Sequence, residues 1–358
     1  MIDSFSQSLR RLSAPLRSLW LAFAVACLPA PVIAQVQLEG TLVVANRTGG
    51  SVSFIDLPSG IEMARFPIGA RIPHEVAVSP NGRLAVSSEY GGNDDPGTKV
   101  FVFDVVEARL LGDVELGPQT RPHSLAFLPD SRRVVVTMER ADAIALIDVV
   151  DRRVIETFTA GGSDNHMVRV SPDGNTAFVT GRGGEGTLSI IDLTGEDETT
   201  VLVTGAGAEG LAVSPDGNEV WVANRRDQSV AVVDVRRRRI AEKIATAPFV
   251  GRAEITPAGR VLVPNGSFGG ESAPQQLTLY DRQSREQMAR HRVREAEDNN
   301  GGFNIHVVDE FAFVSDRTSG AIEIYDLANF PASTVLFANH DYPDGMAFSH
   351  LRMNSVTQ

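Results

Sequence analysis

The sequence has almost no cysteine. Its single cysteine, Cys27, lies in an N-terminal segment with the features of an export signal. If that segment is removed, the mature chain has no disulfide, no thiolate nucleophile and no cysteine metal ligand. The sequence also has no Cys-x-x-Cys-His haem-attachment motif, no phosphate-cradling glycine loop and no serine-centred nucleophile turn. These absences exclude thiol chemistry and several common enzyme classes.

Positive charge is also scarce. The chain has 33 Lys and Arg against 45 Asp and Glu, a formal net charge of −12. Removal of residues 1–34 takes away three arginines and one aspartate, which makes the charge two units more negative. Such a chain is repelled by nucleic acid and anionic lipid. The one basic cluster, Arg236–Arg239, falls in a predicted turn, so no nucleic-acid partner is expected.

The only strongly apolar run is short. Leu19–Leu28 is apolar but too short to span a bilayer. It follows a positively charged stretch that contains Arg10, Arg11 and Arg17. Small residues then place a cleavage site after Ala34, which predicts a secretory signal peptide over residues 1–34 and a periplasmic or secreted protein without a membrane span. The alternatives are an uncleaved anchor or a lipoprotein modified at Cys27.

Residues 35–358 repeat a unit of four short strands. The unit is clearest at Gly207–Ile244, where β-rich runs are separated by turns such as Ser-Pro-Asp-Gly. Third strands that end at an aspartate recur seven times, at Val52–Asp56, Val100–Asp104, Ile144–Asp148, Leu188–Asp192, Val230–Asp234, Leu277–Asp281 and Ile322–Asp326. We interpret each aspartate as a turn former. Seven units at this pitch predict an all-β, seven-bladed β-propeller with four-stranded antiparallel blades, as a single domain.

The two ends of the repeat array complement each other. The array begins with a second strand, Thr41–Asn46, that has no first strand before it. It ends with a first strand, Gly345–His350, that has no second strand after it. We therefore expect the C-terminal strand to pair with the N-terminal one and close the ring, which removes the exposed sheet edges.

Several short motifs recur within the blades: Ser-Pro-Asp-Gly at 171–174 and 214–217, Ser-Pro-Asn-Gly at 79–82, Val-Ala-Asn at 44–46 and 222–224, and Ser-Val-x-x-x-Asp at 51–56 and 229–234. They resemble the YVTN-type repeat of YncE-like seven-bladed propellers, over Thr41–Met353. The resemblance implies the propeller fold. Neighbouring propellers in the broader group include lactonase-like enzymes, electron-transfer dehydrogenase subunits and periplasmic metal-handling proteins, so the resemblance leaves the function open.

One repeat position concentrates groups that bind metals or move protons. In five blades it lies six residues before the proline that follows the first strand, and in the other two it is placed by strand alignment. It is expected at the mouth of the central channel. Around the closed ring its occupants are Asp344, His74, His123, His166, Glu209, Gly251 and Gly301. Three of the chain's seven histidines share this one position.

A second ring is expected one shell further out, directly after the second strands. Its residues are Arg47, Glu89, Glu139, Arg182, Arg225, Gly266 and Arg317. The mouth is therefore expected to be polar and of mixed charge. The loops between Val86 and Val100 and between Val263 and Leu277 are longer than their counterparts, and extra length on one face often carries binding groups.

The favoured interpretation is a non-catalytic binding or scaffold protein. A small molecule or a partner protein would bind at the mouth, where His74, His123, His166, Glu209 and Asp344 meet the outer ring.

The first alternative is a metal site. Imidazoles flanked by a carboxylate suit a divalent zinc, copper or iron ion, and the same five residues are the possible ligands.

The second alternative is a lactonase-like hydrolase, which the resemblance allows. His166 or Glu209 would activate water, and Arg182 or Arg225 would hold the substrate and stabilise the oxyanion.

Overall fold

The computed structural model describes residues 38–69, 72–266, 273–294, 304–317, 319–337 and 341–354. The predicted signal peptide, Gly301 and most of the long loop after Gly266 lie outside these ranges. Within them, no helix is long and apolar enough to cross a membrane.

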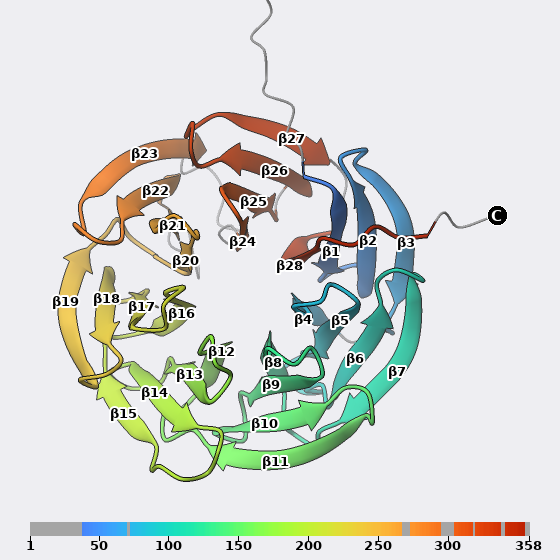
Figure 1. The fold of residues 1–358 in the computed structure, drawn as a ribbon, viewed down its shortest axis with the longest axis horizontal. Helices are drawn as coiled ribbons and strands as arrows, with labels where there is room; N and C mark the ends of the chain where they lie inside the picture. Colours follow the sequence, from blue (N-terminus) through green and yellow to red (C-terminus); the bar gives the residue numbers. More distant parts are fainter. Residues whose placement is uncertain are drawn as a thin grey trace, which may run out of the picture. The chain divides into compact units, whose positions relative to one another are not determined.

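The described chain forms seven antiparallel sheets of four strands, arranged around a central axis (Figure 1). The predicted seven-bladed propeller is confirmed. The strands of the first four blades, from the channel outward, are β28 (Pro343–Ser349), β1 (Gly40–Asn46), β2 (Ser51–Leu57) and β3 (Ile61–Pro67); β4 (Pro73–Val78), β5 (Leu84–Glu89), β6 (Lys99–Asp104) and β7 (Arg109–Glu115); β8 (Pro122–Phe127), β9 (Arg133–Met138), β10 (Ala143–Asp148) and β11 (Arg153–Thr159); and β12 (Asn165–Val170), β13 (Thr176–Gly181), β14 (Thr187–Asp192) and β15 (Thr200–Val203).

The remaining three blades follow the same order. Their strands are β16 (Ala208–Val213), β17 (Glu219–Asn224), β18 (Ser229–Asp234) and β19 (Arg239–Ala245); β20 (Glu254–Ile255), β21 (Arg260–Asn265), β22 (Gln275–Asp281) and β23 (Gln287–Arg294); and β24 (Asn304–Val308), β25 (Phe311–Asp316), β26 (Ala321–Asp326) and β27 (Ser333–Phe337).

The ring closes within blade 1. The C-terminal strand β28 pairs with β1, with Thr41 opposite Ser349 and Val44 opposite Met346. The innermost strand of this blade therefore comes from one end of the chain and the other three strands come from the opposite end (Figure 1). This is the closure that the incomplete terminal units predict.

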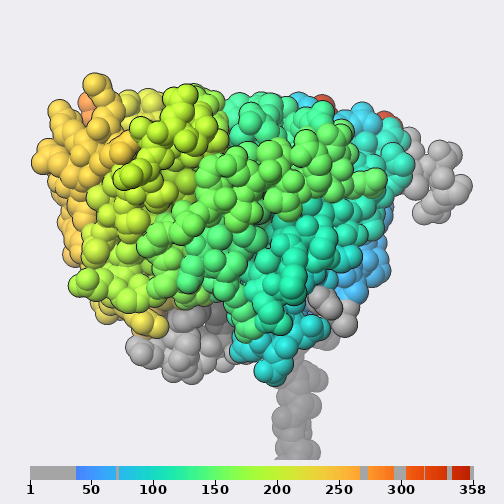
Figure 2. Space-filling model, turned by 90° about the horizontal axis from the view of Figure 1, so that it is seen from below, coloured from blue at the N-terminus to red at the C-terminus, as the bar shows by residue number. Residues whose placement is uncertain are grey.

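Burial changes from the axis to the rim. The second and third strands of blade 1 are buried along their whole length, whereas the outer strand β3 alternates between exposed and half-buried positions. The middle strands are enclosed on both faces by neighbouring blades, and accordingly their sequences are almost continuously apolar. Seven hydrophobic clusters fill the spaces between adjacent blades. Outer strands of blades 2 to 5 form the part of the perimeter seen in Figure 2.

The aspartates that end the third strands cap the following turns. The Asp104 carboxylate accepts a hydrogen bond from the Glu107 N–H at 3.0 Å, and Asp148 accepts one from the Val150 N–H at 2.9 Å. These bonds confirm the turn-forming role and leave the third-strand aspartates outside the candidate site.

Candidate functional site

A β-bulge positions five of the seven predicted residues of the inner ring. In blade 2 the register shifts between Pro73 and Val76, so that two residues of the inner strand oppose one residue of β5. Bulges bend a strand and re-aim its side chains. The same shift occurs in four further blades, and the first bulge residues are His74, His123, His166, Glu209 and Asp344.

In blades 2, 3 and 4 a hydroxyl near the end of the second strand fastens the bulge to the next blade. Thr137 Oγ1 accepts a hydrogen bond from the Ser124 N–H at 2.9 Å and donates one to the His166 carbonyl at 2.9 Å. Equivalent bonds to the next blade run from Ser88 to the His123 carbonyl at 2.8 Å and from Thr180 to the Glu209 carbonyl at 2.7 Å. The backbone around the histidines is therefore held from blade to blade.

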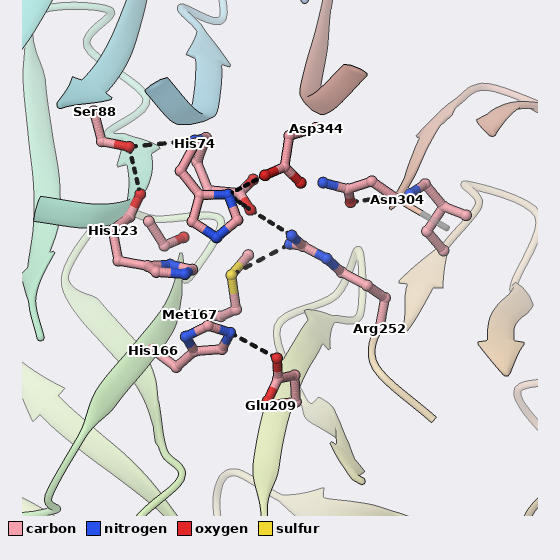
Figure 3. A network of polar contacts seen from close by, with 12 residues as sticks. His74, Ser88, His123, His166, Met167, Glu209, Arg252, Asn304 and Asp344 are labelled. Carbon is pink, nitrogen blue, oxygen red and sulfur yellow. Dashed lines mark hydrogen bonds and ion pairs between the residues drawn. The ribbon is translucent and has the colours of Figure 1, made fainter. Parts of the chain in front are cut away.

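Three histidine rings lie in contact along one arc of the mouth (Figure 3). The ring centroids of His74 and His123 are 4.4 Å apart, and those of His123 and His166 are 3.9 Å apart. Tyr90, from the loop after β5, packs edge-on against His74 at 4.8 Å. His123 is fully buried, and neither of its nitrogens has a hydrogen-bond partner among the described residues.

A carboxylate closes each end of this arc. His74 Nδ1 lies 2.6 Å from Asp344 Oδ2, and His166 Nε2 lies 2.9 Å from Glu209 Oε1 (Figure 3). All five side chains are buried. The structure thus brings together the five residues that the repeat alignment selects, in the same order.

Arginines in turn hold the two carboxylates. Arg47 Nη1 lies 3.2 Å from Asp344 Oδ2, and Arg317 pairs with the other oxygen of Asp344. Arg225 pairs with Glu209. Each of these guanidinium groups comes from the predicted second ring.

Arg182 and Glu139 of the second ring also meet. They form an ion pair, and Arg182 Nη2 lies 3.0 Å from Asp164 Oδ1 as well. Glu89 has a different position, because its Oε2 accepts a hydrogen bond from the Thr98 N–H at 2.9 Å. It therefore holds the long loop after β5, whose contribution to the site is Tyr90.

The mouth encloses a cavity of about 240 Å³. Among the described residues its lining carries one carboxylate, that of Glu209, and Gly251 and Gly266 contribute only backbone beside Phe249 and Asn265. Five arginines line it: Arg47, Arg182, Arg225, Arg252 and Arg317. The cavity is therefore rich in cationic hydrogen-bond donors.

Burial and positive neighbours keep the central histidines neutral. Desolvation, followed by the adjacent imidazoles and guanidiniums, lowers the pKa of His123 well below its ordinary value. Desolvation, then Arg182 and Arg225, does the same to the pKa of His166.

Asp344, at the other end of the arc, and Arg225 both stay charged. Burial alone would raise the pKa of Asp344, but Arg317 and then His74 hold it well below its usual range. Burial, opposed by Glu209, lowers the pKa of Arg225 to about 10, and repulsion from Arg182 adds to this lowering. Arg225 therefore remains a cation at neutral pH, close to other cations.

Three important residues were missing from the sequence prediction. They are Glu75, Met167 and Arg252, and each directly follows a predicted residue of the inner ring. Glu75 and Met167 are the second residues of their bulges, and Arg252 has the equivalent position in blade 6. Arg252 reaches across the channel to pair with Glu75, and its Nη1 lies 3.2 Å from Met167 Sδ (Figure 3). The same repeat alignment, moved on by one residue, would have found them.

A candidate metal-binding group also includes Glu75, the second residue of the bulge in blade 2. Ligand atoms of His74, Glu75 and His123 lie within 4.8 Å of one another. Two imidazole nitrogens and a carboxylate oxygen are a donor set that Zn²⁺ accepts. His166, Glu209 and Asp344, which the sequence analysis includes as possible ligands, lie outside this group.

His166 has limited access to the cavity as a base. Its Nε2 contacts Glu209, and its Nδ1 is buried without a hydrogen-bond partner among the described residues. A general base must reach the proton that it removes. In this arrangement, neither nitrogen of His166 is available to act as the general base that the hydrolase hypothesis requires.

Comparison with known proteins supports the fold and adds one family match. A family model described as the cytochrome D1 haem domain matches residues 129–263, from blade 3 into blade 6. Hydrazine synthase from Kuenenia stuttgartiensis has a similar structure, with a TM-score of 0.63 and 18% identity over 71% of this chain and 76% of that chain. A functionally unknown protein from Desulfotomaculum acetoxidans DSM 771 has a TM-score of 0.70 and 13% identity over 88% and 100%. Comparison with curated proteins finds no match.

The haem-domain match raises the question of whether this mouth suits a haem. The arginines suit the carboxylates of a tetrapyrrole. An axial ligand, however, must present a free nitrogen to the iron, and both nitrogens of His123 and Nδ1 of His166 are buried. The cavity of about 240 Å³ is also smaller than the roughly 300–1,000 Å³ of typical cofactor pockets. The small cavity and the buried nitrogens of His123 and His166 argue against a haem, and His74, which lines the cavity and whose Nδ1 is held by Asp344, remains the candidate axial ligand.

Proposed function

We propose that the protein is an exported, YVTN/YncE-like binding propeller that holds a small polyanion in its mouth. The ligand would carry two or more carboxylate or phosphate groups. The observation that supports it is the lining of the cavity, where five arginines, each paired with a carboxylate, present guanidinium donors around about 240 Å³. Planar guanidinium groups are the side chains best suited to bind carboxylates and phosphates through paired hydrogen bonds.

Preorganisation supports this proposal. Buried carboxylates orient the guanidinium groups before any ligand arrives, as Asp344 does for Arg47 and Arg317. A guanidinium has five N–H donors, so one ion pair leaves others for a ligand. Fixing the donors in advance lowers the entropy cost of binding.

Crowding of like charges supports it as well. Besides burial, repulsion from Arg182 and Arg317 contributes to the lowered pKa of Arg225, which is about 10. A bound anion would offset this repulsion. It would bind in the mouth cavity, beside Arg182 and Arg225.

Isothermal titration calorimetry with mature protein tests the proposal. Citrate and inorganic phosphate serve as polyanionic probes, and acetate serves as the single-carboxylate control. We expect citrate to bind more tightly than acetate, more weakly at high salt, and at least about tenfold more weakly after Arg47→Gln or Arg225→Gln. Arg153→Gln, at an exposed arginine of the outer strand β11, is the matched control and should leave binding unchanged.

Two outcomes would contradict the proposal. One is the absence of saturable heat with citrate and with phosphate. The other is citrate binding that Arg47→Gln and Arg225→Gln leave unchanged. A parallel titration with haemin, followed by absorbance, identifies a tetrapyrrole ligand if the spectrum shifts and the shift is lost in His74→Ala.

A metal site is the second candidate, because His74, Glu75 and His123 bring three ligand atoms within 4.8 Å. Glu75 would have to exchange its ion pair with Arg252 for the metal. Metal analysis of untagged protein is the test, and we expect one zinc, copper or iron ion per chain and none in His123→Ala. Substoichiometric metal in the wild-type protein would remove this candidate and leave the polyanion proposal intact.

A further inference from the structure

A second cavity, of about 290 Å³, lies in the central channel. Its lining runs from Glu75, in the bulge of blade 2, and Asn304, at the start of β24, to the opposite ends of the inner strands, at Val78 and Phe127. Arg252 lines this cavity and the mouth alike, and its ion pair with Glu75 of blade 2 crosses the channel between them. The channel cavity is therefore a separate compartment.

The charged groups of this compartment compensate one another. Arg252 pairs with Glu75, and Arg169 Nη2 lies 2.7 Å from Glu254 Oε1. Two guanidiniums and two carboxylates leave no net charge. Between them the walls are apolar, formed by Val76, Ala77, Leu125, Ala126, Ile305 and Met346.

Asn304 adds a hydrogen-bond donor without a partner. The residue is 2% exposed, and its Oδ1 accepts a hydrogen bond from the Ile305 N–H at 3.0 Å. That bond fixes which end of the amide is the oxygen. The Nδ2 group is buried and has no partner among the described residues, which is unfavourable unless a ligand or a water molecule accepts from it.

His306 supplies a second neutral donor. Its Nε2 accepts a hydrogen bond from the Phe348 N–H at 3.1 Å, so the proton of the neutral ring is on Nδ1. Burial lowers the pKa of His306, which keeps the ring neutral. Both His306 and Asn304 line the cavity.

We propose that the channel cavity binds a small uncharged carbonyl compound, such as a cyclic ketone, amide or ester. Its carbonyl oxygen accepts hydrogen bonds from Asn304 Nδ2 and His306 Nδ1, and its apolar body packs against the aliphatic walls. A charged ligand is disfavoured, because the apolar walls between the ion pairs cannot replace its hydration. This site is independent of the polyanion site at the mouth.

Ligand-observed saturation-transfer NMR with the mature protein tests the site. Cyclohexanone is the probe, and cyclohexanecarboxylate is the charged analogue of similar shape. We expect saturable binding of cyclohexanone and at least about fivefold weaker binding of the carboxylate. Asn304→Leu should weaken cyclohexanone binding by at least about fivefold, whereas Asn329→Leu, at an exposed asparagine in the same blade, should not.

Ala77→Leu provides a second variant, because it fills the cavity without touching either donor. It should abolish cyclohexanone binding, and Arg47→Gln at the mouth should not alter it. Three results overturn the proposal: no saturable signal up to tens of millimolar, which means that the cavity holds water only; tighter binding of the carboxylate than of the ketone; or binding that survives Ala77→Leu.

Discussion

Replacing His123 with leucine should preserve or raise stability, although His123 lies at the centre of the candidate site. The imidazole is fully buried, and neither nitrogen has a hydrogen-bond partner in the described part of the chain. A buried polar group without a partner costs about 1–3 kcal/mol. His123→Leu places an apolar side chain of similar size at this position and so removes that cost. We therefore expect the free energy of unfolding at pH 7.5 to be unchanged or up to about 2 kcal/mol higher.

The same substitution should also remove a dependence on pH. The pKa of His123 is well below its ordinary value in the folded state, so below pH of about 6.5 the unfolded chain binds a proton that the folded chain does not. The contribution of His123 to the free energy of unfolding of the wild-type protein is fully present above that pH and decreases as the pH is lowered. Between pH 7.5 and pH 5.5 the loss is about 1.4 kcal/mol.

Denaturant unfolding at these two pH values, in the presence of a chelator, measures both effects. Trp221 is the only tryptophan outside the predicted signal segment and is fully buried, so its fluorescence reports unfolding. Other groups titrate in both proteins, and the difference between wild type and His123→Leu isolates His123. An equal pH dependence in the two proteins, or a loss of several kcal/mol at pH 7.5, would refute the reasoning.

Two further predictions concern the ring and its inner wall. Deletion of Gly345–Gln358 removes most of β28 and leaves β1 with an unpaired edge, so we expect aggregation in size-exclusion chromatography and rapid proteolysis; a monomeric, protease-resistant product would contradict the closure. Gly345→Ala should cost about 1–3 kcal/mol in denaturant unfolding, because the added Cβ lies 2.6 Å from backbone atoms of His74 and Glu75. Gly92→Ala meets no atom within 4 Å and is the matched control; equal effects would show that the close approach is unimportant.

The sequence was sufficient to predict the fold, because every blade carries the same local signals. Strand runs and the aspartate that ends the third strand recur seven times, and Pro-Asp-Gly or a related turn follows most first strands. Each of these is a short-range feature. Ring closure followed from the two incomplete units at Thr41–Asn46 and Gly345–His350. Both parts of the prediction are confirmed by the pairing of β1 with β28.

The candidate site could be predicted only in part. Repeat alignment located His74 and Asp344 because both occupy one fixed position of the unit. It missed Arg252 and Glu75, whose ion pair crosses the channel between blades 6 and 2. Such a contact depends on the diameter of the ring and on the length of a side chain, which the pattern of a single unit does not contain. Glu89 shows the converse, since its repeat position suggested the mouth, whereas its hydrogen bond holds a loop.

The closure of blade 1 also constrains the order of folding. Thr41 Oγ1 donates a hydrogen bond to the Leu351 carbonyl across 310 residues of sequence. Contacts of such high sequence separation form late, because their loop-closure entropy must be overcome first. Blades 2 to 7 are each built from contiguous chain, whereas β1 has no inner neighbour until the last residues are available. A chain still emerging from a ribosome or a translocation pore therefore cannot complete blade 1 before β28 has emerged, and until then β1 remains a template for intermolecular pairing.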